Sequence, residues 1–251
     1  MSTLNEAKAK FVSLVDDAKL REQEVVIRAA CLTPEQAIGS PTRADYPIVK
    51  GKERMIEADF LGAKGQAFTD TPVTFAGTLT DILDLPLEDN GNRAIFLATL
   101  NAVLNHLGLC QGTIHCKNDE PEQCANEIAA YFMRTYQDAT IGLIGFNPAI
   151  AENLVGAFGK ERVAITDLFD GNIGERRFGV HILDGARQVD ALVAMSDVLL
   201  ITGTTITNDT FDGIRKLAKY RNKPFLLFGV TGAGVAALTG IERLCPCSHR
   251  C

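Results

Sequence analysis

Cysteine and histidine residues gather in two short segments of the chain, and these are the side chains that could bind a soft metal ion. The seven candidate ligands are His115, Cys116 and Cys124 in the first segment, and Cys245, Cys247, His249 and Cys251 in the second. Thiolate and imidazole groups are the ligands that zinc, iron and iron–sulfur clusters take in proteins. The two segments therefore predict a site for a transition metal, either zinc or iron or an iron–sulfur cluster.

In the first segment the spacing favours a folded-back loop. Pro121, with acidic residues before it, is typical of a helix start, so Cys124 lies in a first turn, where the macrodipole favours a thiolate. His115 and Cys116 are near enough upstream for the loop to reach Cys124. The spacing is not C-x-x-C, and buried cysteines of an ordinary core are the alternative.

In the second segment every other residue is a candidate ligand, so an extended chain would present all four on one side. Metal or cluster binding, a redox-active dithiol of Cys245 and Cys247, and a disordered tail are the three alternatives. The sequence leaves open whether the two segments meet.

Composition narrows the class of protein. The chain has 251 residues, of which 46% are hydrophobic and 22% charged, which excludes a disordered or coiled-coil protein. Its net charge of −6 gives no general attraction to nucleic acid or to anionic membranes. The charged start and the lack of a long apolar run predict a cytoplasmic protein. Seven cysteines are too few for a disulfide scaffold.

Residues 1–110 are predicted to form an α+β domain. Apolar residues three and four apart indicate an amphipathic helix over 3–20, followed by a strand over 24–32. Short apolar stretches over 55–61, 65–69 and 73–77 could be strands of an antiparallel sheet. The segment 92–109 predicts a helix that is apolar on so many sides that we expect it to be buried between layers.

Beyond about residue 136 strands alternate with helices, which predicts a parallel sheet. The expected strands cover 140–146, 162–166, 197–202 and 224–230, and the expected helices cover 148–158, 186–195 and 210–221. The predicted fold class is α/β, with a smaller α+β domain (1–110), a connector with one helix (111–136) and a Rossmann-like domain that has a parallel sheet (137–251).

Ligands of such sheets bind at the carboxyl ends of the strands, where this chain places three loops, the third of which, Gly229–Gly234, adds flexible backbone and one hydroxyl group. The first, Gly142–Pro148, lacks the G-x-G-x-x-G spacing, which argues against a dinucleotide, although Asn147 opens a helix N-terminus that could bind another anion. The second, Thr202–Thr210, is rich in hydroxyl groups. We expect Thr204, Thr205 and Asn208 to contact a ligand, with simple helix capping as the alternative.

Basic residues concentrate in one stretch of this acidic chain, and Lys50, Lys52 and Arg54 are its candidate contacts to an anionic ligand. The alternative is a solvated loop. Whether these residues face the predicted cleft depends on the fold.

The segments Gly142–Pro148 and Ser196–Thr210, together with Ala98-Thr-Leu-Asn-Ala102, resemble the putative heavy-metal chelation family. The resemblance implies an enolase-N-terminal-like domain followed by a Rossmann-like domain, with a binding or active site between them. The chain departs from the family pattern after Gly229, where Val230-Thr231-Gly232 replaces Gly-Pro-Ser.

These observations predict a protein that holds a metal, or a metal-bearing or anionic small molecule, in a cleft between two domains. An enzyme with a nucleotide-like cofactor and a thiol redox protein are the two alternatives. The expected partner is a metal or small molecule and not nucleic acid or a membrane. The sequence leaves open whether the protein forms a homo-oligomer and whether it catalyses a reaction.

Overall fold

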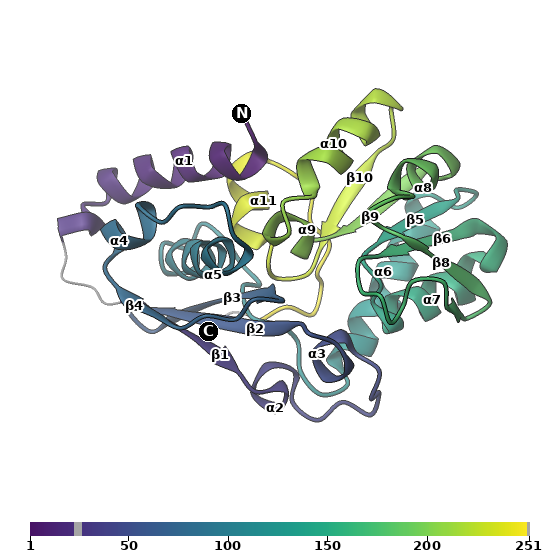
Figure 1. The fold of residues 1–251 in the computed structure, drawn as a ribbon, viewed down its shortest axis with the longest axis horizontal. Coiled ribbons are helices and arrows are strands. Elements are labelled where there is room, and N and C mark those ends of the chain that lie inside the picture. The colour runs from purple at the N-terminus through teal and green to yellow at the C-terminus, as the bar shows by residue number, and fades with distance from the viewer. Residues whose placement is uncertain (23–26, 250–251) are drawn as a thin grey trace.

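The computed structural model describes residues 1–22 and 27–249, which contain one antiparallel and one mostly parallel sheet (Figure 1). No helix in these residues has both the length and the apolar character that crossing a membrane requires. The mixed α/β class predicted from the sequence is confirmed. The start of the first predicted strand, residues 24–26, lies outside the described residues.

The first half of the chain builds a four-stranded antiparallel sheet in the order β3-β2-β1-β4. Its elements are α1 (Thr3–Asp17), η1 (Leu20–Glu22), β1 (Ile27–Leu32), α2 (Pro34–Ile38), α3 (Pro47–Lys50), β2 (Arg54–Phe60), β3 (Ala63–Thr69), β4 (Phe75–Gly77), α4 (Leu79–Leu83) and α5 (Asn90–His106). The short helices α2, α3 and α4 were not predicted. Each fills a segment where prolines and polar residues indicated only loops.

Helix α5 is the centre of this half and is buried on almost every side, as its apolar pattern predicted. It packs on β2 and β3 and also contacts α11. A side chain on Gly65 of β3 would lie 2.2 Å from the backbone nitrogen of Ala102, so a glycine is required where strand and helix approach.

The second half forms a six-stranded sheet in the order β10-β9-β5-β6-β8-β7, parallel except for the β7–β8 pair. Its elements are α6 (Glu120–Thr135), β5 (Ile141–Ile144), α7 (Pro148–Phe158), η2 (Lys160–Arg162), β6 (Val163–Asp167), β7 (Arg176–Arg177), β8 (Val180–Asp184), α8 (Val189–Met195), β9 (Val198–Thr202), α9 (Thr204–Thr207), α10 (Phe211–Tyr220), β10 (Phe225–Phe228) and α11 (Ala233–Thr239). The sequence predicted neither the β7–β8 hairpin nor α9 and α11.

Alternate residues of the central strands belong to two hydrophobic clusters, one on each face of this sheet. In β9, Leu199 and Ile201 join the cluster that contains α1 and α5, whereas Val198 and Leu200 join the cluster that contains α6 and α7. The first cluster thus runs through both halves. The division at residues 110 and 136 stays a prediction.

Asn101 of α5 connects the two halves through three buried hydrogen bonds. Its amide nitrogen donates to the carbonyl of Gln66 at 2.9 Å and to that of Val230 at 3.0 Å, and its oxygen accepts from the backbone N–H of Gly234 at 2.7 Å. The side chain is fully buried. One amide group therefore satisfies polar backbone groups from β3, from the turn after β10 and from the first turn of α11.

We expect Asn101→Ala to lower the free energy of unfolding by about 3 kcal/mol or more, because three buried backbone groups lose their partner. Asn105→Ala is the matched control one turn later, where the side chain makes one half-buried bond to the Lys64 carbonyl, 3.2 Å long. Its expected loss is about 1 kcal/mol or less. Denaturant unfolding of both variants measures the difference, and equal losses would contradict the role assigned to Asn101.

Candidate functional site

A cavity of about 1120 Å³ lies at the carboxyl ends of β5, β6, β9 and β10. Residues of the first half, among them Tyr46, Glu53 and Phe68, form its opposite wall. The strand order reverses between β5 and β9, which is the point where ligands of open parallel sheets bind. The volume suits a small molecule and far exceeds one ion.

Gly145 directly follows β5 beside this switch point with φ +89°, a backbone conformation that favours glycine. A Cβ atom there would stand 2.3 Å from Cγ2 of Thr202. The glycine therefore lets the loop after β5 lie directly against the end of β9. The next residues open α7, where the Asn147 side chain accepts a bond from the Ile150 N–H at 3.1 Å.

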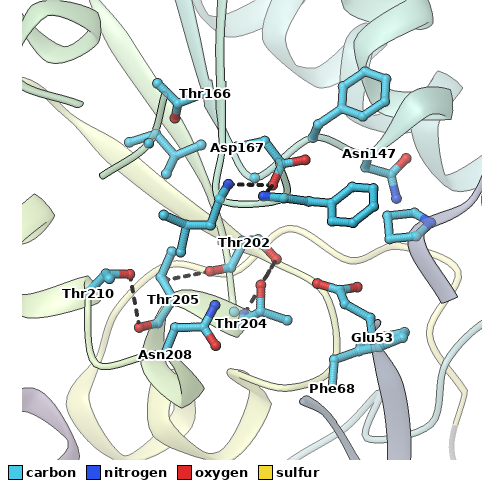
Figure 2. Close-up of a pocket in the computed structure, with 18 of the residues that line it drawn as sticks. Glu53, Phe68, Asn147, Thr166, Asp167, Thr202, Thr204, Thr205, Asn208 and Thr210 are labelled. Carbon is cyan, nitrogen blue, oxygen red and sulfur yellow. Dashed lines mark hydrogen bonds between the residues drawn. The ribbon is translucent and has the colours of Figure 1, made fainter. Parts of the chain in front are cut away.

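The threonine-rich loop lines the cavity, as the sequence analysis expected of Thr204, Thr205 and Asn208. The hydroxyl groups of Thr202 and Thr204 lie 2.9 Å apart, and the Thr205 hydroxyl donates to the Thr202 carbonyl at 2.7 Å. Figure 2 shows these groups beside Asn208 and opposite Glu53. The loop combines internal capping with polar groups that face the cavity.

Five carboxylates on the cavity were not among the predicted site residues, namely Asp170, Asp209 and the three considered below: Glu53, Asp70 and Asp167. Burial and the nearby negative charges of Asp167 and Asp70 raise the pKa of Glu53 to about 7. Burial also raises the pKa of Asp167, although hydrogen bonds from Asn172 and from two backbone N–H groups oppose this. The three carboxyl groups come from both walls of the cleft.

Only one of the three predicted cationic contacts lies on the cavity, namely Lys52. Lys50 ends α3 outside the lining. Arg54 also lies outside it, because its guanidinium donates to the backbone carbonyls of Gly51 and Glu53, at 3.2 and 2.7 Å. The cleft wall is consequently more acidic than the basic stretch of sequence suggested.

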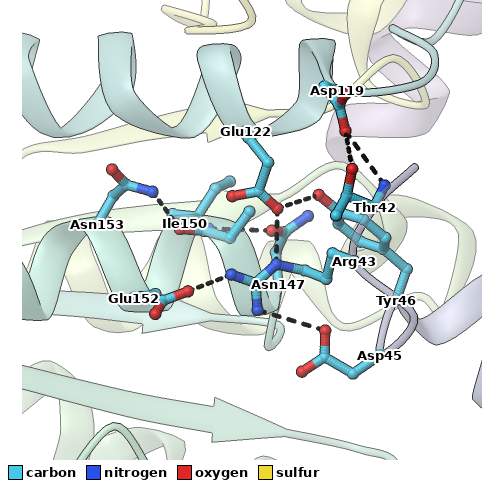
Figure 3. A network of polar contacts seen from close by, with 11 residues as sticks. Thr42, Arg43, Asp45, Tyr46, Asp119, Glu122, Asn147, Ile150, Glu152 and Asn153 are labelled. Carbon is cyan, nitrogen blue, oxygen red and sulfur yellow. Dashed lines mark hydrogen bonds and ion pairs between the residues drawn. The ribbon is translucent and has the colours of Figure 1, made fainter.

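Arg43 holds the first-half wall in place through carboxylates on three separate segments (Figure 3). Its guanidinium pairs with Glu122 of α6 at 2.6 Å, with Asp45 at 3.3 Å and with Glu152 of α7. Glu122 also accepts a hydrogen bond from the Tyr46 hydroxyl at 2.9 Å. The loop that leads to Glu53 is thereby fixed to the helices that cover the parallel sheet.

The two cysteine segments meet beside the cleft. Ile114 and His249 form an antiparallel bridge, which places residues 245–249 against residues 112–116. Contact with the Cys116 thiol, together with burial, raises the pKa of Cys124 to about 12, although contact with Cys245 opposes this rise. His249 pairs with Glu120 at 2.6 Å, and Cys251 lies outside the described residues.

His115 lies between the cleft and the cysteine segments. Its ring packs edge-to-face on Phe68, with ring centroids 5.5 Å apart, and it lines the cavity. Its Nδ1 atom donates to the Cys116 carbonyl at 2.6 Å. Within residues 1–22 and 27–249, no three Cys, His, Asp or Glu side chains are already spaced to hold one metal ion.

Sequence reasoning missed the carboxylates for two different reasons. Glu53 lies between Lys52 and Arg54, so its neighbours suggested a basic site. Asp167 lies in the sequence where a ribose-binding acid would fall, at the end of a buried parallel strand, but a single acid at a strand end is common, so Asp167 was not chosen as a site residue. Asp70 follows an antiparallel strand, and nothing in its sequence context sets it apart.

The fold and the site define a mixed α/β protein with a ligand-sized cleft at the switch point of a mostly parallel sheet. Residues 128–241 match the model of a family described as putative heavy-metal chelation, which confirms the resemblance predicted from the sequence. This description supports metal binding as a coarse function, without naming a metal or a site.

Two solved structures of proteins with unknown function from this family are similar in fold. One, from Pyrococcus horikoshii, is 14% identical, with a TM-score of 0.57 over 96% of this chain and 85% of that chain. The other, from Desulfitobacterium hafniense, is 16% identical, with a TM-score of 0.50 over 74% of this chain and 72% of that chain. No curated protein matches the chain.

We expect Glu53→Gln to raise the melting temperature at about pH 8 and to change it little at about pH 5. The pKa of this carboxyl is near 4.5 when unfolded and about 7 in the fold, so its contribution to stability is full below pH 4.5 and is lost as the pH rises through 7. Thermal unfolding across this range is the measurement. Glu161→Gln, at an exposed carboxylate, is the control, and a pH-independent effect at Glu53 would contradict the assignment.

Proposed function

We propose that the protein binds a divalent metal ion in the cleft, together with a small molecule that carries it. The observation behind this proposal is that carboxylates from both walls, Glu53, Asp70 and Asp167, line one cavity. Asp167 and the threonine-rich loop lie within residues 128–241, which match the family model, whereas Glu53 and Asp70 come from the first half.

The charge balance of the cleft supports a cationic ligand. Burial is the largest cause of the raised pKa of Glu53, and the negative charges of Asp167 and Asp70 raise it further, so both carboxylates repel the ionised form of Glu53. None of them takes part in an ion pair among the described residues. A divalent cation between the walls would remove this repulsion and favour the ionised form of Glu53.

The donor atoms indicate which cation suits the cleft. Carboxylates, the hydroxyls of Thr202 and Thr204 and the amide oxygens of Asn147 and Asn208 are hard oxygen donors, which Mg²⁺ and Mn²⁺ prefer. The remaining volume would hold the organic part of the ligand. Lys52 would contact an anionic group on it, while Thr205 would keep the threonine loop in shape.

The proposal is tested with Mn²⁺ alone as the probe, by equilibrium dialysis of the wild-type chain and its variants. We expect Glu53→Gln and Asp167→Asn each to weaken Mn²⁺ binding at least tenfold, because each removes one negative charge from the cleft. Asp138→Asn, an exposed carboxylate ahead of β5, is the matched control and should bind like the wild type. Unchanged affinity in both cleft variants, or no Mn²⁺ binding by the wild type, would overturn the proposal.

The position of Asp167 favours a second candidate, a ligand that contains a nucleoside. In Rossmann-type sheets an acidic side chain at the end of the second strand binds the ribose hydroxyls, and Asp167 ends β6, the strand next to the switch point. Both carboxylate oxygens of Asp167 already accept hydrogen bonds that fix their orientation. The missing glycine fingerprint argues against NAD and NADP within this class.

Thermal shift with ATP and with S-adenosylmethionine distinguishes this candidate. A nucleoside ligand at 100 times its dissociation constant adds about 2.7 kcal/mol to the free energy of unfolding. We expect Asp167→Asn to abolish such a shift and Asp138→Asn to preserve it. The absence of a shift with either compound at millimolar concentration would count against a nucleoside ligand.

A further inference from the structure

Residues 245–249 are held against residues 112–116 by backbone pairing and close packing. The His249 N–H donates to the Ile114 carbonyl at 2.8 Å, and the Ile114 N–H donates back at 3.3 Å. A Cβ atom on Gly112 would stand 2.0 Å from the Ser248 hydroxyl, so the two segments touch. The two cysteine segments, far apart in the sequence, are therefore neighbours in the fold.

The pair Cys245 and Cys247 is carried on a closed turn. The Ser248 hydroxyl donates to the Cys245 carbonyl at 2.7 Å, and the Ser248 N–H donates to the same carbonyl at 3.3 Å. Ahead of the turn, the Leu244 N–H donates to the carbonyl of Leu227 in β10 at 2.8 Å. The turn is fixed on both sides and cannot be treated as a loose tail.

Four thiols converge at this place around Cys124, in the first turn of α6. Cys116 and Cys124 belong to one buried cluster, Cys247 packs against that cluster, and the thiols of Cys116 and Cys245 are near enough to Cys124 to influence its pKa. Cys116 and Cys124 are buried, the other two are half-buried, and all four are free thiols. Core packing alone does not require two buried and two accessible thiols from separate segments to come together.

We propose that Cys116, Cys124, Cys245 and Cys247 form a binding site for a soft or borderline divalent metal ion such as Zn²⁺. Four thiolates are a ligand set that tetrahedral zinc sites use. None of the four lines the cleft, and all lie outside the family-matched residues 128–241. The site is thus separate from the proposed function in the cleft.

Metal binding requires the site to close. The described sulfur atoms are gathered but not yet spaced as ligands of one ion. The half-buried side chains of Cys245 and Cys247 form the accessible side of the cluster, so these two side chains would turn towards Cys124 while the backbone of the turn stays in place. A bound ion would then cross-link two distant parts of the chain, which raises the melting temperature.

The predicted imidazole ligands both have other partners, although His115 also borders the cluster, with its Nδ1 atom 3.8 Å from the Cys116 sulfur. His249 pairs with Glu120 at 2.6 Å, and the His115 ring faces Phe68 and the cleft. Cys31 is exposed on β1 and Cys110 is buried just after α5, and neither takes part in the contacts around Cys124. These two cysteines provide natural controls within the same chain.

The reduced full-length chain, purified anaerobically, is titrated with Co²⁺ as a spectroscopic substitute for Zn²⁺. We expect thiolate-to-cobalt charge-transfer absorption that saturates at one ion per chain and disappears when Zn²⁺ is added. Alkylation of the Zn²⁺-loaded chain should spare the four cluster cysteines, while Cys31 and Cys110 react as they do without the metal. Cys245→Ser and Cys247→Ser, at half-buried positions, should each weaken Co²⁺ binding at least tenfold, and Cys31→Ser should bind normally.

Two results would overturn the proposal: no charge-transfer absorption in the wild type, or equal absorption in both serine variants. Protection from alkylation that persists after chelation and is lost on addition of a thiol reductant would indicate a disulfide instead. Asp167→Asn separates the two sites, because it should keep the Co²⁺–thiolate absorption while it loses Mn²⁺ binding. Conversely, Cys247→Ser should keep Mn²⁺ binding in the cleft.

Discussion

The buried amide of Asn101 is the interaction on which the arrangement of the two sheets depends. It joins the middle of α5 to β3 on one side and to the turn after β10 on the other. Beside it, the Phe68 N–H donates to the Thr231 hydroxyl at 3.0 Å, so a further hydrogen bond joins β3 to the segment after β10. Phe68 and Thr231 both line the cavity, so the width of the cleft is set by this row of hydrogen bonds.

The molecule separates its potential ligands by chemical type. The cleft presents carboxylate, hydroxyl and amide oxygens, whereas the cluster around Cys124 presents sulfur. Hard cations favour the first set and soft cations the second. Residues 113–116 pass between the two regions, with the His115 ring on the cleft side and the Cys116 thiol on the cluster side.

Local patterns were sufficient to predict most of the second half of the fold. The buried strands β5, β6, β9 and β10 and the helices α6, α7, α8 and α10 follow from apolar runs, prolines and caps that lie close together in the sequence. The hairpin of β7 and β8 escaped because β8 pairs with β6 through contacts outside its own segment, and its burial alternates only partly. The acidic wall and the meeting of the two cysteine segments depend on contacts between residues far apart, which spacing alone does not encode.

Helix α11 packs on α1 and α5, and residues 248–249 pack on residues 112–114. The early part of the chain is therefore covered by residues that are synthesised more than a hundred residues later. At about 5–20 residues per second, α1 and α5 wait several seconds or more for the surface that buries them. During synthesis their apolar faces remain available to chaperones, and this part of the core is completed only after α11 has been made.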